Sequence, residues 1–92
     1  MEAVQIYYVQ NTLVMRQRHS ELVIIPVHVE NLKKLENPKD FSQYFLEHAL
    51  VNRSARKLFL AWIRKDGGLW KKIYEKLQSP ADDAMGEEVK ES

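Results

Sequence analysis

Apolar and polar side chains alternate with a period of two along the first part of the chain, which is the pattern of half-buried β-strands. Val4, Ile6 and Tyr8 share one side of a first predicted strand, in a segment rich in β-forming residues. Leu13 and Met15 share one side of a second predicted strand. The pattern therefore predicts two consecutive strands, each with one apolar face.

The most apolar stretch of the chain, Leu22–Val29, follows these two strands. We expect a third strand there, with a shared buried face made by Val23, Ile25, Val27 and Val29. Pro26 has no amide hydrogen to donate, so this strand should lie at an edge of the sheet or carry a bulge. The sequence predicts a three-stranded antiparallel meander, followed by a polar connector at 30–37.

Three helices are predicted after the connector. Asn37 is a preferred N-cap residue and Pro38 suits the first helical position, so the first helix should extend from Lys39 to Leu50. Two further segments place their apolar residues on one side at helical spacing. These segments are Ala55–Lys65 and Leu69–Gln78.

Three single residues have predicted structural roles. Trp62 lies in the middle of the apolar face of its helix and should be buried. Gly67 follows that helix and suits a left-handed C-terminal cap. His48 falls within the apolar face of the first helix, where we expect a half-buried imidazole bonded to backbone.

These elements predict an α+β fold, in which an N-terminal three-stranded antiparallel sheet packs against about three C-terminal helices. We expect one small domain at 1–80 and a flexible acidic tail at 81–92, because the tail has almost nothing to bury. The 92 residues include no cysteine, which excludes disulfides and thiol chemistry. No apolar run approaches the ~18 residues that span a bilayer, so the sequence predicts a cytoplasmic protein that does not bind membranes.

Charge is distributed unevenly along the chain although the net charge is only +1. Residues 53–76 carry eight basic side chains and two acidic ones, a net charge of +6. Residues 81–92 carry five acidic side chains and one basic one, a net charge of −4. A basic block of this kind points to a polyanionic partner, although a solvated Lys/Arg-rich helix face is an equally good interpretation.

The search for catalytic motifs finds no nucleotide-binding, zinc-protease or nucleophile-elbow signature. Two His/Glu pairs, His19 with Glu21 and His28 with Glu30, have the spacing to share strand faces, but nothing in the sequence brings the pairs together to hold a metal. His48 has no partner at a spacing that would make it a general base. We expect no enzymatic activity, no metal and no cofactor.

Residues 53–78 resemble a helix-turn-helix unit, in which Asp66-Gly67-Gly68 joins a supporting helix to a recognition helix. Its polar side chains would contact mainly phosphates, which supply most of the affinity for nucleic acid. The candidate nucleic-acid-binding residues are Arg56, Lys57, Arg64, Lys65, Lys71, Lys72, Lys76 and Gln78. This pattern favours a small regulatory DNA-binding protein.

The alternative is a protein–protein interaction module or a small inhibitor. Exposed tyrosine and tryptophan residues anchor many protein interfaces, and candidates here are Tyr7, Tyr8, Trp62 and Trp70. The predicted edge strand at Leu22–Val29 offers a second contact surface, including one for a homodimer. The sequence leaves both classes of partner open.

Overall fold

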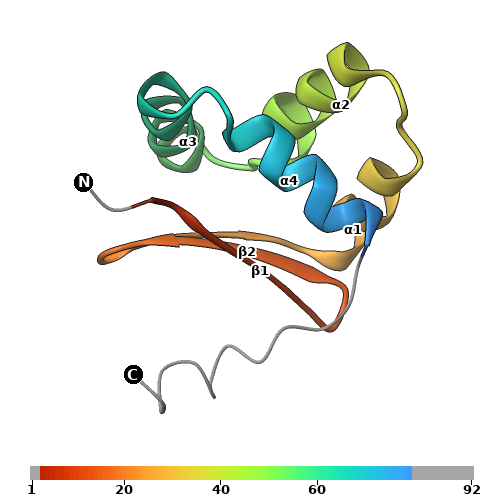
Figure 1. Ribbon diagram of the computed structural model, residues 1–92, viewed down its shortest axis with the longest axis horizontal. Coiled ribbons are helices and arrows are strands. Elements are labelled where there is room, and N and C mark those ends of the chain that lie inside the picture. The colour runs from red at the N-terminus through yellow and green to blue at the C-terminus, as the bar shows by residue number, and fades with distance from the viewer. Residues whose placement is uncertain (1–2, 80–92) are drawn as a thin grey trace.

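The computed structural model describes residues 3–79 of the chain and confirms the α+β architecture. All of its helices lie on one side of the sheet (Figure 1). The elements in chain order are β1 (Gln5–Val9), β2 (Thr12–Gln17), β3 (Ser20–Ile24), α1 (Pro26–Lys33), α2 (Pro38–Tyr44), the π-helical segment η1 (Phe45–Ala49), α3 (Arg53–Lys65) and α4 (Leu69–Gln78). The described part of the chain thus has four α-helices, one more than the sequence predicted. The acidic tail predicted at 81–92 lies outside the described residues.

The three strands form an antiparallel meander in the order β1-β2-β3, as predicted. Leu13 pairs with Tyr8 on one side and with Ile24 on the other, and all three side chains are buried beneath the helices. Gln10 and Asn11 join β1 to β2, both with positive φ, which is the conformation of a tight two-residue hairpin. Asparagine tolerates that conformation, so a hairpin forms without glycine.

The predicted strand at Leu22–Val29 is wrong in its second half. β3 ends at Ile24, and Pro26 occupies the first position of α1, where its missing amide hydrogen costs nothing because that group has no helical partner. The predicted inward face is also wrong, since Val23, Ile25 and Val27 are 48%, 48% and 57% exposed. Leu22 and Ile24 face the core instead, and α1, which ends at Lys33, takes up the first half of the predicted connector at 30–37.

Side-chain caps explain where α2 and α3 begin. The Asn37 side chain accepts hydrogen bonds from the amides of Lys39 (2.8 Å) and Asp40 (3.3 Å), which confirms the predicted N-cap. Asn52 does the same for the amide of Ala55 at 2.7 Å, so α3 begins at Arg53, two residues earlier than predicted. The predicted first helix is split, because its second half winds as the π-helix η1.

Two of the three single-residue predictions are wrong. Neither Gly67 nor Gly68 has a positive φ, and the turn is held instead by the Asp66 carboxylate, which accepts the Gly68 amide hydrogen at 3.0 Å. His48 is exposed, with its ring 4.9 Å from that of Tyr44. Trp62 is buried as predicted, with 3% of its surface exposed. α4 has the predicted bounds, and its buried face is the predicted one, made by Leu69, Ile73 and Leu77.

An aromatic cluster on the helical side of the sheet joins α2, η1, α3 and α4. Phe45 of η1 lies 4.7 Å from Phe59 of α3 between ring centroids, and Trp70 of α4 packs edge-on against both, at 5.4 Å and 5.0 Å. Phe45 and Phe59 are fully buried. This packing fixes how α3 and α4 are rotated about their axes, and so which of their polar side chains face outward.

Candidate nucleic-acid interface

α3 has the highest net charge of the helices and strands in residues 3–79. Its thirteen residues include five basic side chains and no acidic one. The exposed positions Arg53, Lys57 and Arg64 recur at helical spacing along one side of the helix, and Leu60 lies between them. Phe59 and Trp62 are buried on the opposite side. Core packing therefore turns a continuous basic face of α3 outward.

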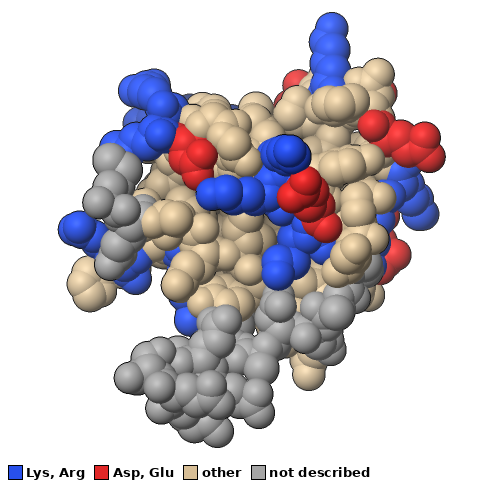
Figure 2. Space-filling view, viewed as in Figure 1, with Lys and Arg blue, Asp and Glu red and all other residues tan. Residues whose placement is uncertain are grey.

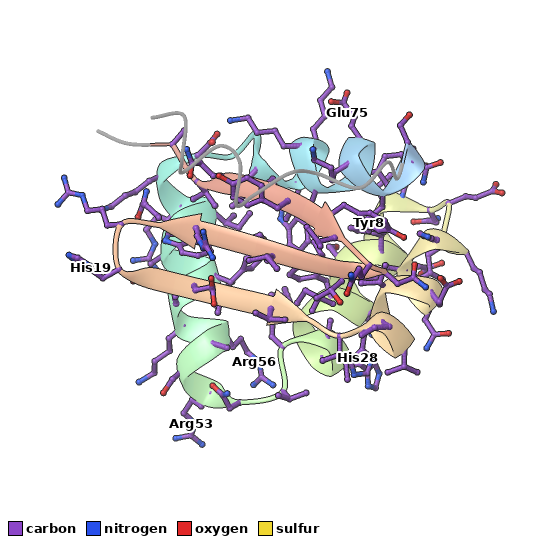
Figure 3. All side chains as sticks on the ribbon, turned by 90° about the horizontal axis from the view of Figure 1, so that it is seen from below. Tyr8, His19, His28, Arg53, Arg56 and Glu75 are labelled. Atoms are coloured by element: carbon purple, nitrogen blue, oxygen red, sulfur yellow. The ribbon has the colours of Figure 1, made fainter. Side chains whose placement is uncertain are left out.

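This basic face lies at one end of the molecule. α3 crosses the sheet, and its N-terminal end, with Arg53 and Arg56, extends past β3 (Figure 3). The β2–β3 turn, with His19 at its tip, lies at the same end of the molecule (Figures 1 and 3). An extended polyanion could follow α3 along this end without meeting an acidic side chain from the helix itself.

The two ends of α3 hold their basic residues differently. At the N-terminal end, Arg56 donates from Nε to the Leu46 carbonyl oxygen of η1 at 3.1 Å, which leaves its other guanidinium hydrogens available. At the C-terminal end, Arg64 and Lys65 lie in the last turn, where the helix dipole favours positive charge. Arg56 therefore has a partly structural role, whereas the side chains of Arg64 and Lys65 form no hydrogen bond or ion pair with another side chain of residues 3–79.

α4 has a less uniform charge than α3. Lys71 and Lys72 are exposed and Lys76 is half-buried, but Glu75 lies among them. Figure 2 accordingly shows acidic atoms between basic ones on the face that includes α4. Lys72 Nζ also forms an ion pair with Asp66 Oδ2 at 3.1 Å. The predicted recognition helix therefore offers less free positive charge than its supporting helix.

The structure contains the two helices predicted for the helix-turn-helix unit and divides their candidate residues between two surfaces. The two helices and their three-residue turn are present, and α4 packs along β1 while α3 crosses the sheet (Figure 1). The candidate residues separate into two sets. One set lies on α3 and consists of Arg56, Lys57, Arg64 and Lys65; the other lies on α4 and consists of Lys71, Lys72, Lys76 and Gln78. Arg53 belongs with the first set, and its spacing from Lys57 and Arg64 would have identified it from sequence.

No known family model, curated protein or solved structure matches this chain.

The two predicted histidine–glutamate pairs are not brought together in the structure. His28 Nδ1 lies 2.9 Å from the Tyr44 hydroxyl, and Glu30 lies 3.6 Å from the Lys33 ammonium group. Glu21 forms a 2.7 Å ion pair with Arg16. Within residues 3–79, no group of three or more His, Asp or Glu side chains is arranged to hold a metal ion.

Asp66 controls how much of the α4 charge is available. Its hydrogen bond with Lys72, together with the one from the Gly68 amide, lowers the pKa of the Asp66 carboxyl below its usual 3.8. A lowered pKa stabilises the fold at pH values above 3.8, and this contribution is lost as the pH falls through the pKa of the folded state. At neutral pH the carboxylate is charged and engages the Lys72 ammonium group.

We predict that Asp66→Asn strengthens nucleic-acid binding. The amide oxygen can still accept the Gly68 amide hydrogen, but Lys72 no longer faces a carboxylate and becomes free to contact a phosphate. The plot of log affinity against log salt should steepen by about one unit in a fluorescence-anisotropy titration.

Asp40→Asn is the matched control, because it makes the same chemical change on α2, at an exposed position. It should change the salt slope by less than Asp66→Asn does. Equal effects of the two variants would mean that only net charge matters and that the Asp66–Lys72 pair does not limit binding.

Proposed function

We propose that this protein is a small, non-catalytic, regulatory nucleic-acid-binding protein. The observation that carries this proposal is the exposed face of α3, with five basic side chains and no acidic one on the helix. The lysines of α4 form a second and less uniform basic set after the Asp66–Gly68 turn. Phosphate contacts by lysine and arginine release counterions, and this release supplies most of the affinity for nucleic acid.

The distribution of charge favours binding through the sugar-phosphate backbone. Arginine forms forked hydrogen bonds to phosphate, and three of the exposed α3 residues, Arg53, Arg56 and Arg64, are arginines. The outward face of α4 has lysines, which contact phosphate as point charges and lack the forked geometry of arginine. We therefore propose binding with little sequence preference, in which α3 makes the larger contribution.

Protein binding through the sheet edge is the second candidate function. It is favoured by β3, an edge strand that carries the exposed Val23 and is followed directly by the exposed Ile25. Three of the aromatic anchors expected for this function are buried, namely Tyr7, Tyr8 and Trp62. Of the four candidate aromatic anchors, only Trp70 is partly exposed, so the strand edge is the main surface for a protein partner.

A salt-titrated binding assay tests the proposal. The wild-type protein should bind oligonucleotides of unrelated sequence with similar affinities, and log affinity should fall linearly with log salt. Absence of binding at low ionic strength would overturn the proposal and leave the sheet edge as the candidate surface. Sedimentation of the free protein would test the homodimer predicted through that edge.

No helix within residues 3–79 is long and apolar enough to cross a membrane. The cytoplasmic location predicted from the sequence stays a prediction.

A further inference from the structure

A pocket of about 590 Å³ opens between the start of α2 and the first half of α4. Pockets that hold small ligands usually have volumes of about 300–1,000 Å³, are lined mainly by apolar and aromatic groups, and contain a few polar groups. This pocket has that character. Its main lining residues are Pro38, Lys39, Phe41, Trp70, Lys71 and Tyr74.

The aromatic rings of this pocket are held from behind by the core. Phe41 is buried and meets Trp70 and Tyr74 edge-on, with ring centroids 6.4 Å and 5.5 Å apart. Trp70 also packs against Phe45 and Phe59. Trp70 and Tyr74 are only half-buried, so each ring is fixed on its core side while part of its surface lines the pocket.

The charged groups of the pocket favour an anionic ligand. Lys39 approaches from α2 and Lys71 from α4, and both are exposed. Neither lysine forms an ion pair with another side chain of residues 3–79, whereas Glu36 is the one acidic residue of the lining. A ligand with an apolar ring and a nearby negative charge fits this arrangement.

The pocket also follows the C-terminal end of α3 along the chain. Lys65 ends α3, and Trp70 and Lys71 of the pocket lining lie in the first turn of α4, after the Asp66–Gly68 turn. We expect phosphates that cross the C-terminal end of α3 to approach the pocket. Aromatic side chains beside a basic surface form the stacking platforms of proteins that bind single strands. The bases of a duplex are stacked on each other and cannot enter such a pocket unless they are flipped out.

We propose that this pocket accepts an unpaired nucleobase, and that the protein therefore prefers single-stranded nucleic acid to duplex. This inference rests on the proposed function, because α3 would hold phosphates farther along the same strand. Lys39 and Lys71 contact the phosphates next to that base, while Trp70 and Tyr74 contact its ring.

The test compares a single-stranded oligothymidine with a duplex of equal length at the same salt concentration. The wild-type protein should bind the single strand more tightly. Tyr74→Leu should weaken single-strand binding about tenfold, within the range observed when a stacking residue is removed, and should leave duplex binding unchanged. Tyr74→Phe keeps the ring and is the matched control, which should retain the preference.

Lys57→Gln separates failure of this inference from failure of the proposed function. It lies on α3, away from the pocket lining, and should weaken single-strand and duplex binding by the same factor. If neither oligonucleotide binds at low salt, the proposed function and the inference both fail. If both bind but Tyr74→Leu leaves the ratio of their affinities unchanged, the inference is wrong and the proposed function stands. Thermal melts of each variant would verify that the fold is retained.

Discussion

Replacing Arg53, Lys57 and Arg64 together with glutamine should weaken nucleic-acid binding about 100-fold at low ionic strength. This estimate takes about 1 kcal/mol for each lost contact, the upper value for exposed ion pairs, and about tenfold in affinity per 1.4 kcal/mol. The slope of log affinity against log salt should fall by about three units, one for each lost phosphate contact.

The triple variant should fold normally. All three side chains are exposed on the outward face of α3, and glutamine has a helix propensity close to those of arginine and lysine. Circular dichroism should therefore show unchanged helix content, and a thermal melt should show a transition within a few degrees of that of the wild type. Any loss of binding can then be assigned to the surface charge.

Lys34→Gln is the control for charge in general. Lys34 is exposed at the C-terminal end of α1, outside the basic block, so its replacement removes one positive charge without altering α3. Its effect should be much smaller than the effect of Lys57→Gln measured in the same buffer. A Lys34→Gln variant that weakens binding as much as Lys57→Gln would show that binding follows net charge alone, without a defined surface.

Trp62→Ala should destabilise the fold by about 3–5 kcal/mol, the usual cost of truncating a buried tryptophan. Trp62 is 3% exposed and packs with the core from the inner side of α3. Small domains have a free energy of unfolding of about 5–15 kcal/mol, so this single change would remove a large share of it. Urea denaturation followed by circular dichroism would measure the loss.

Leu60→Ala on the same helix is the matched control. Leu60 is 41% exposed, so its truncation leaves little cavity and should cost well under the value for Trp62. If the two variants were destabilised equally, the orientation of α3 described above would be wrong, and with it the outward position of its basic face. This control therefore tests the geometry on which the proposed interface depends.

Features that depend on a few adjacent residues were predictable from the sequence. The bounds of α4 follow from its apolar spacing, and the start of α2 follows from Asn37 and Pro38, because a cap is made within three or four residues. The buried positions Leu13 and Met15 follow from strand alternation. The basic block at residues 53–76 was also evident, because the charge of a segment follows directly from its sequence.

Features that depend on distant residues needed the tertiary structure. An apolar run such as Leu22–Val29 suits a buried strand or a helix equally, and Pro26 is acceptable at a strand edge and at the first position of a helix. Packing of Val29 and Leu32 in the core decides in favour of α1. Val23 and Ile25 were both predicted to be buried and are both exposed, because alternation gives a period and leaves the buried face undetermined.

At the candidate site, too, adjacent residues determine some features and distant residues determine others. The sequence by itself determined that residues 53–76 are basic, but it could not show that core packing of Phe59 turns the α3 charges outward or that Asp66 engages Lys72. Nor could it bring Lys39 and Phe41 of α2 beside Trp70 of α4 to form a pocket. Helix caps and the spacing of apolar residues depend on neighbours in the chain. Which side of an element is buried, which ion pairs form and where a pocket opens depend on which elements the hydrophobic core brings together.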